Sequence, residues 1–248
     1  MSLPLVSPNW DVPANVKAFC STRHGGVSET PWDSLNLALH VDDKTTSVEE
    51  NRLRLEQTTG LPNPKWLKQT HSTRVIQHSF SSHDADGCYS DRFGQACIVM
   101  TADCLPILLC NEEGSWVAAI HAGWRGLADD ILFNAVQQYK GSSPLIAWIG
   151  PAISEKFFEV GAEVRNSFIN KNSQLDRYFN ANSHQKWQCD LAGIAECELT
   201  RYGVNVHQSN LCSYSDADNF YSHRRATHQF GNTATTGRMA SVIWLESL

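Results

Sequence analysis

The sequence predicts a single α+β domain in which helices cover mixed β-sheets. The chain has 248 residues, and no internal repeat or low-complexity linker divides it, so one large domain is expected over residues 1–248. Apolar runs of strand length alternate with segments of helical spacing. A tight hairpin between two of these runs excludes an all-parallel sheet.

The expected strands are short runs bounded by turn residues. They cover residues 66–68, 74–77, 96–100, 105–110, 116–121, 145–149, 204–206 and 239–245. The hairpin joins the runs 105–110 and 116–121 through the segment from Asn111 to Gly114.

The expected helices combine apolar residues at helical spacing with start and stop signals at their ends. They cover residues 48–59, 127–139 and 161–169, and a fourth begins after Asp190 and ends before Gly203. Ser47 and Glu50 form a capping box for the first helix, which Gly60 ends. The polar stretch 170–188 is interpreted as a surface insertion within the domain.

Composition limits the classes of partner. With 26 acidic residues against 20 Lys and Arg, the net charge is −6, which gives no electrostatic reason to bind nucleic acid or an anionic membrane. The first ten residues lack the pattern of a signal peptide, and no apolar run approaches the roughly 18 residues of a membrane span. We expect a cytoplasmic protein that binds small molecules. Its oligomeric state is not predicted.

The chain has eight cysteines, none of them in a Cys-x-x-Cys pair. This disfavours zinc ribbons and thioredoxin-like redox sites. Seven are expected to be reduced and buried as small apolar residues. Cys104 is the exception.

Cys104 and His121 are candidate metal ligands. If Asn111 lies opposite Gly114 in the hairpin, these two residues face each other with Cβ atoms roughly 5 Å apart. A buried cysteine beside a structural histidine explains the same spacing, and a Cys–His pair can also act as nucleophile and base. His71, expected at a turn between two strands, is a third candidate, although no local spacing ties it to Cys104. Two His and one Cys would leave an open position on zinc, as in catalytic sites.

The segment from His121 to Gly126 is expected to turn from a strand into a helix. Its glycines permit close approach of a ligand, and Arg125 offers a planar donor fork to phosphate or carboxylate. Other basic clusters contain Arg23, Arg224, Arg225 and Arg238. Single clusters of this kind are usually solvated, but several in an acidic protein favour a pocket that holds an anion.

The chain resembles a known family along its whole length. The segments that carry the resemblance are Ser21-Thr22-Arg23-His24-Gly25-Gly26-Val27-Ser28, Ser34-Leu35-Asn36-Leu37, Thr101-Ala102-Asp103-Cys104-Leu105-Pro106, His121-Ala122-Gly123-Trp124-Arg125-Gly126, Ile149-Gly150-Pro151-Ala152-Ile153 and Ser222-His223-Arg224-Arg225. They resemble the family named variously polyphenol oxidase (laccase)-like, purine nucleoside phosphorylase and peptidoglycan editing factor.

The resemblance implies an α/β/β/α layered domain with a metal bound by one Cys and two His. The ligands carried over are His71, Cys104 and His121. Together with Arg125 from the turn after His121, they are the expected catalytic residues. The expected substrate-binding residues are Arg23, Asn36, Arg224 and Arg225. Two positions depart from the family's usual pattern: Gln-Thr-His-Ser stands around His71 where Gln-Val-His-Gly is usual, and His223 replaces an aromatic residue.

The implied activity is phosphorolysis of adenosine, inosine and methylthioadenosine to free base and ribose 1-phosphate, with adenosine deamination in addition. Zinc is the expected cofactor, and copper can occupy the same ligands. The usual zinc deaminase signature is absent. Asp103 is a candidate acid–base residue, although strand alternation points it away from Cys104.

Three alternatives remain open. The first is a hydrolase of a peptidoglycan precursor, and the second is a copper-dependent polyphenol oxidase. The sequence contains no His-x-His pair and one triad supports a single ion, so laccase activity is expected to be secondary. The third is a regulatory protein that binds ligands in the same pocket.

Overall fold

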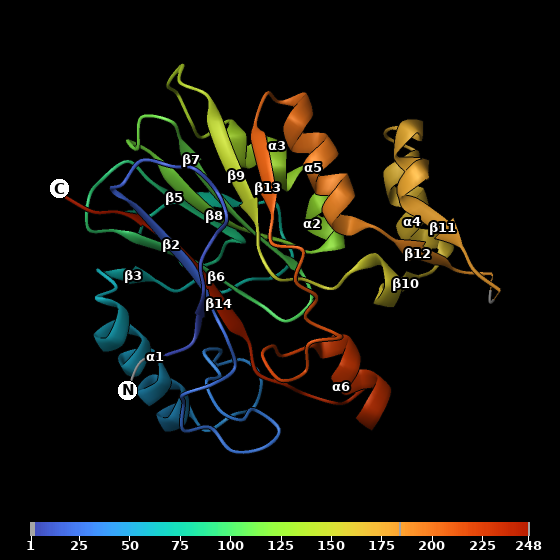
Figure 1. Cartoon of the computed structure of the whole chain (residues 1–248). Helices are drawn as coiled ribbons and strands as arrows, with labels where there is room; N and C mark the ends of the chain where they lie inside the picture. The colour runs from blue at the N-terminus through green and yellow to red at the C-terminus, as the bar shows by residue number, and fades with distance from the viewer. Residues whose placement is uncertain (1–2, 184, 248) are drawn as a thin grey trace.

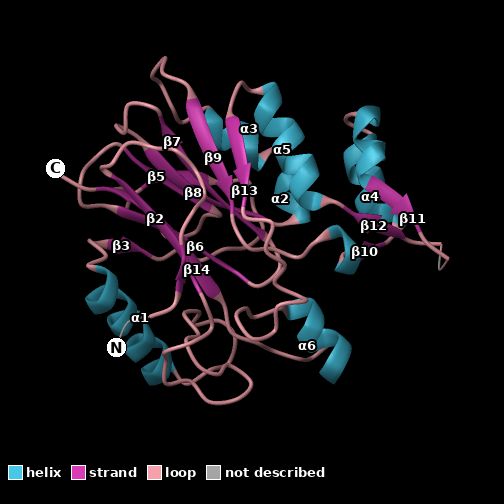
Figure 2. Ribbon diagram, in the orientation of Figure 1, coloured by secondary structure: helices cyan, strands magenta, loops and turns pink. Residues whose placement is uncertain are grey.

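Two mixed β-sheets lie face to face between outer helices (Figures 1 and 2). This arrangement is seen in a computed structural model that describes residues 3–183 and 185–247. Three apolar clusters fill the spaces between the layers. The predicted α+β class and its α/β/β/α layering are confirmed. No helix among the described residues is long and apolar enough to cross a membrane.

The larger sheet has six strands, with parallel pairs at its two edges and antiparallel pairs between them. Their spatial order is β13 (Asn205–Gln208), β9 (Leu145–Ile149), β7 (Leu105–Asn111), β8 (Val117–Ala122), β5 (Gly87–Ser90) and β4 (Val75–Gln77). Strands β7, β8 and β9 form its fully buried centre.

The second sheet has five strands and brings the two ends of the chain together. Their order is β1 (Leu5–Val6), β2 (Val16–Ser21), β14 (Met239–Leu245), β6 (Ala96–Thr101) and β3 (Pro64–Lys65). β14 pairs antiparallel with both β2 and β6.

The central strands are apolar throughout because both of their faces are buried. Alternate side chains of a strand point to opposite faces. On β7, Ile107 and Leu109 pack toward the outer helices, whereas Leu108 and Cys110 lie in the cluster between the sheets. A continuous apolar run is the pattern typical of such doubly covered strands.

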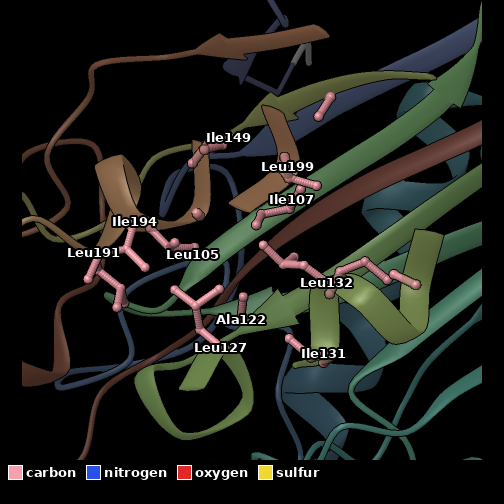
Figure 3. Close-up of a cluster of buried hydrophobic side chains, with 14 of the residues drawn as sticks. Leu105, Ile107, Ala122, Leu127, Ile131, Leu132, Ile149, Leu191, Ile194 and Leu199 are labelled. Atoms are coloured by element: carbon pink, nitrogen blue, oxygen red, sulfur yellow. The ribbon is translucent and has the colours of Figure 1, made fainter. Parts of the chain in front are cut away.

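Helices α2 (Trp124–Ala128), α3 (Ile131–Val136) and α5 (Leu191–Arg201) cover the six-stranded sheet, and α1 (Thr45–Thr59) covers the five-stranded one. Figure 3 shows the apolar contact between the six-stranded sheet and its covering helices. The labelled residues are Leu105, Ile107, Ala122, Leu127, Ile131, Leu132, Ile149, Leu191, Ile194 and Leu199. The predicted cap of α5 is confirmed, because Asp190 accepts a hydrogen bond from the Gly193 backbone N–H at 2.8 Å.

A small third sheet projects from one side of the fold (Figure 1). It contains β10 (Glu159–Val160), β12 (Trp187–Cys189) and β11 (Phe179–Ala181), accompanied by α4 (Ala162–Ile169) and the 3-10 turns η1 (Glu155–Phe157) and η2 (Ser173–Tyr178). The predicted insertion 170–188 therefore has structure of its own, and one of its residues, His184, lies outside the described residues. Helix α6 (His223–Phe230) lies near the end of the chain.

Several predicted elements differ from the structure. The helix predicted over 127–139 is split into α2 and α3, because Asp130 adopts a left-handed backbone conformation (φ 70°). α1 begins before the predicted capping box, with Lys44 as N-cap and no side-chain cap. Only residues 64–65 form a strand near the predicted 66–68. Strands β1, β2, β5, β10, β11 and β12 and helix α6 lie where the sequence predicts no strand or helix.

All eight cysteines are free, as predicted. Five of the seven expected to be buried are buried, namely Cys20, Cys88, Cys97, Cys110 and Cys189. Cys197 and Cys212 are only partly buried, because they lie on an outer helix and in a loop rather than on the central strands.

Candidate metal centre

The three predicted ligands meet at one end of the six-stranded sheet. The ligand atoms of His71, Cys104 and His121 all lie within 4.8 Å of one another. Cys104 Sγ is 3.9 Å from His71 Nε2, and the centroids of the two imidazole rings are 4.9 Å apart. In the described part of the chain, no other cluster of three such side chains is close enough to share an ion.

The hairpin register that predicted this pairing is wrong. His121 lies opposite Pro106, not Cys104. Asn111 accepts hydrogen bonds from the backbone N–H groups of Ser115 and Trp116, so the loop covers residues 112–115 and shifts the pairing. Cys104 lies just before β7 in a bend, from which its thiol still reaches the imidazoles.

Asp86, which no sequence pattern marks, holds both histidines in place. It lies directly before β5 and opposite His121, and its backbone carbonyl accepts the His121 N–H at 2.7 Å. Its carboxylate binds His121 Nδ1 at 2.7 Å, which leaves Nε2 directed toward the other ligands. The same carboxylate accepts the backbone N–H groups of Thr70, His71 and Ser72. It was missed because β5, whose pairing places it there, was not predicted.

The charges of the centre stabilise one another. Burial raises the pKa of the Cys104 thiol, but the imidazoles of His121 and His71 outweigh this and lower it to about 6. Burial lowers the pKa of His121, yet Cys104 and Asp86 raise it to about 9. The pKa of Asp86 falls to about 2 despite burial, because His121 and Ser72 donate to its carboxylate. A thiolate is the form of cysteine that binds metals.

Gly123 is required by the crowding at this centre. A Cβ atom at this position would lie 2.7 Å from the His71 ring and 3.1 Å from Cys104 Sγ, closer than a side chain permits. Helix α2, which begins after Gly123, has only 5 residues. The predicted anion site included the free N–H groups at the start of a long helix. Because α2 is so short, that part of the predicted site is absent among the described residues.

A cavity of about 320 Å³ opens beside the three ligands. Its walls include His40, Gln69, Arg125, His223 and Arg238, and none of the described residues that line it carries a carboxylate. The Gln69 amide is fixed by hydrogen bonds at 2.8 Å to and from the backbone of Met100 on β6. The exposed Arg125 guanidinium lies 4.3 Å from the centroid of the Trp124 ring. The two arginines in these walls, Arg125 and Arg238, favour an anion.

Arg23, Asn36 and Arg225, predicted to bind substrate, are not among the described residues that line this cavity. Arg225 donates to three backbone carbonyls, and Arg23 donates to backbone carbonyls and to the Asp33 carboxylate. Asn36 is buried and accepts the backbone N–H of Arg238 at 3.0 Å. These contacts position the surrounding loops, and direct binding of substrate stays a prediction.

Arg224 and Asp103 lie around a second, smaller cavity that also includes Cys104. Asp103 has a left-handed backbone conformation (φ 94°). Its carboxylate accepts hydrogen bonds from the Ser213 hydroxyl at 2.7 Å and from the Arg224 backbone N–H at 2.6 Å. Asp103 thus connects the bend before β7 to the start of α6.

Comparison with known proteins now places the chain in a family. Residues 17–246 match the family described as multi-copper polyphenol oxidoreductase laccase. The chain belongs to this family. The described residues of this laccase-family member contain a single three-ligand cluster, although the description of the family refers to several coppers.

Its relatives are named as enzymes. A Haemophilus influenzae protein named purine nucleoside phosphorylase is 42% identical over 248 residues, which cover 97% of this chain and 99% of the relative. An Escherichia coli relative named purine nucleoside phosphorylase YfiH is 42% identical and covers 97% of this chain and 98% of its own length. The crystal structure of a Neisseria meningitidis protein is 41% identical, with a TM-score of 0.91 over 98% of this chain and 99% of that one.

Proposed function

We propose that this protein is a metal-dependent purine nucleoside phosphorylase. It cleaves adenosine, inosine and methylthioadenosine with phosphate, giving the free base and ribose 1-phosphate or its methylthio analogue. The observation that carries the proposal is a three-ligand cluster beside a cavity whose charged walls, Arg125 and Arg238, are basic. The names of the relatives support the same activity.

The proposed cofactor is zinc, held by His71, Cys104 and His121. Zinc ligands at about 2.0–2.3 Å from the ion lie roughly 3.3–3.6 Å from one another, so the observed 3.9 Å between Cys104 Sγ and His71 Nε2 needs only a small closure. One sulfur and two imidazoles suit zinc or copper better than magnesium or calcium. When bound, zinc supplies a Lewis acid with a position open to a ligand.

The residues of the chain bind and orient the reactants. Arg125 and Arg238 donate hydrogen bonds to phosphate, while Asp86 keeps the His121 ring in place. A phosphate oxygen forms a bond to the anomeric carbon as the bond from that carbon to the purine nitrogen breaks. The electron pair of the broken bond leaves with the base, and the base takes up the proton that hydrogen phosphate brings to the reaction.

A second candidate is a hydrolase of a peptidoglycan precursor. The observation that favours it is the series Cys104, His121 and Asp86, which has the nucleophile, base and orienting carboxylate of a cysteine hydrolase. Adenosine deamination and copper-dependent oxidation of phenols are proposed only as secondary activities of the same site.

Metal analysis and a phosphate-dependent assay test the proposal. Protein purified without a nickel column is expected to contain about one metal ion per chain and to release hypoxanthine from inosine only when phosphate is present. Equal release of base without phosphate would indicate hydrolysis and contradict the proposal.

Two treatments distinguish the second candidate. Chelation is expected to abolish a metal-dependent phosphorylase. A cysteine hydrolase would keep its activity on a wall precursor after chelation and lose it when Cys104 of the metal-free protein is alkylated.

A further inference from the structure

The second cavity adjoins the metal cavity. It has a volume of about 190 Å³, and the two cavities share Ala102, Cys104 and His223 in their walls. A ligand bound across this shared wall would place different parts of itself in two different environments. The metal cavity is lined by two arginines, whereas the second cavity is smaller and has mostly apolar walls.

Most of the second cavity is apolar. Its walls include Trp124, Ile153, Phe158 and Leu191. Two of these are aromatic, and aromatic side chains are the surfaces on which nucleic-acid bases stack. The cavity is smaller than the roughly 300–1,000 Å³ of sites for drug-sized ligands, so it suits one planar ring system and not an extended saccharide or peptide.

Arg224 lines this cavity and carries hydrogen-bond donors. Its guanidinium donates from Nη1 to the Glu159 carbonyl at 2.9 Å and lies 5.4 Å from the centroid of the Phe158 ring. These contacts fix its position. An arginine has five N–H donors, and in the described part of the chain the guanidinium has no other hydrogen-bond partner.

The cavity offers few acceptors in return. Among the described residues, Asp103 is the only acidic side chain in its walls, and each of its oxygens already accepts one hydrogen bond, from Ser213 or from the Arg224 backbone. A ligand that presents acceptors to Arg224 is therefore matched better than one that presents donors.

We propose that this second cavity binds the purine base of the nucleoside and that Arg224 donates to the acceptor edge of the base. The inference rests on the proposed phosphorylase function. N7 is an acceptor in all purines, and a 6-oxopurine adds O6 beside it, a pair that fits the fork of an arginine. A 6-aminopurine offers N7 but places an amine at position 6. Both classes bind, and the 6-oxopurines depend more strongly on Arg224.

The assignment places the reactants on opposite sides of the sugar. The base lies among the apolar side chains near Phe158, and phosphate lies near Arg238. The ribose lies beside Cys104 and His223, which line both cavities. This order places the attacking oxygen and the leaving nitrogen on different sides of the anomeric carbon, as a displacement requires.

Equilibrium titration of the metal-loaded protein with hypoxanthine and with adenine tests the inference. Arg224→Met is expected to weaken binding of hypoxanthine by about 10- to 100-fold, because contacts to a charged donor are lost, and binding of adenine by less. Arg54→Met is the control, since Arg54 pairs with Glu50 on the outer helix α1 and lines neither cavity. Equal affinities in wild type and Arg224→Met would overturn the inference, as would absence of hypoxanthine binding to the wild type.

A change in the ligand tests the same contact without a mutation. Wild-type protein is expected to bind 7-deazahypoxanthine at least about tenfold more weakly than hypoxanthine, because N7 is missing. Affinities within twofold would overturn the inference even if Arg224→Met fails to fold. Hypoxanthine binding that depends on Arg224, without any phosphorolysis, would contradict the proposed function alone. Phosphorolysis together with equal base binding by wild type and Arg224→Met would contradict only this inference.

Discussion

The metal centre and the basic walls of its cavity are held in place by different means. His121 and Asp86 lie opposite each other where β8 meets the start of β5, and they are joined through both backbone and side chain. Arg125 and Arg238 come from a short helix and a loop, and Arg238 is fixed by backbone carbonyls of its own neighbours, Thr236 and Gly237. Strand pairing fixes His121, and the Asp86 carboxylate fixes the segment that carries His71, so substitutions of the ligands or of Asp86 should weaken or remove the metal. Substitutions in the walls should change only what binds beside it.

The largest effect is expected from Cys104→Ala. Loss of a ligand should remove the metal and lower phosphorolysis by at least about a thousandfold, because the metal contributes several kcal/mol to such reactions. Metal content by mass spectrometry and the rate of base release measure both effects. Cys197→Ala, on helix α5, is the matched control and should retain both. Full metal content in Cys104→Ala would contradict the assignment of this ligand.

Asp86→Asn should weaken metal binding by about 10- to 100-fold, as is usual for partners of metal-bound histidines. The amide cannot accept the backbone N–H groups of the 70–72 segment on its NH₂ side, so the segment that carries His71 loosens. Competition with a chromophoric chelator measures the affinity. Asp84→Asn, an exposed neighbour paired with Lys68, should leave it unchanged. Equal affinities of the two variants would show that the carboxylate does not support the centre.

Substitutions in the cavity walls should act on phosphate and not on the metal. Arg125→Ala and Arg238→Met are each expected to raise the KM for phosphate by about 10- to 100-fold, because a charge-assisted contact to an anion is lost. Metal content should stay at the wild-type level. A phosphate KM that is unchanged in both variants would show that phosphate does not bind at Arg125 and Arg238, and that another basic cluster of the chain binds it.

The smallest effect on catalysis is expected from Arg23→Met. The guanidinium of Arg23 already donates to the carbonyls of Asp33 and Ala217, so the phosphate KM should remain within about twofold while the free energy of unfolding falls by about 1 kcal/mol. Urea unfolding followed by tryptophan fluorescence measures the latter. A large rise in KM without loss of stability would instead support the predicted role in substrate binding.

The local apolar pattern predicted where strands begin and end, but it did not predict how β7 and β8 pair. The predicted bounds of β9 and β14 agree with the structure, because β9 is wholly apolar and β14 is apolar apart from Ser241. The register of β7 and β8 could not be predicted, since the Glu112-Glu113 segment specifies no turn type and Asn111 adds residues to the loop through its side chain. The break at Asp130 interrupts a helical pattern that is otherwise intact.

The site could be predicted only as far as residue types and family resemblance allow. His71, Cys104 and His121 were identified, and the structure brings them together. Asp86 could not be identified, because it becomes a neighbour of His121 only through pairing between distant segments. The separation of Arg224 from Arg225 was also not predictable. The two are adjacent in the sequence, yet one lines a cavity and the other binds backbone carbonyls.

The position of β14 has a consequence for how the protein is made. This last strand lies between β2 and β6, which leave the ribosome long before it. Until β14 is synthesised, both of these strands present an unpaired edge, and such edges favour aggregation of nascent chains. The nascent chain also cannot close the apolar layer between the sheets, because Met239 and Ile243 belong to it. A ribosome that stalls before residue 239 would therefore leave a product with both edges unpaired, and this product is expected to need a chaperone.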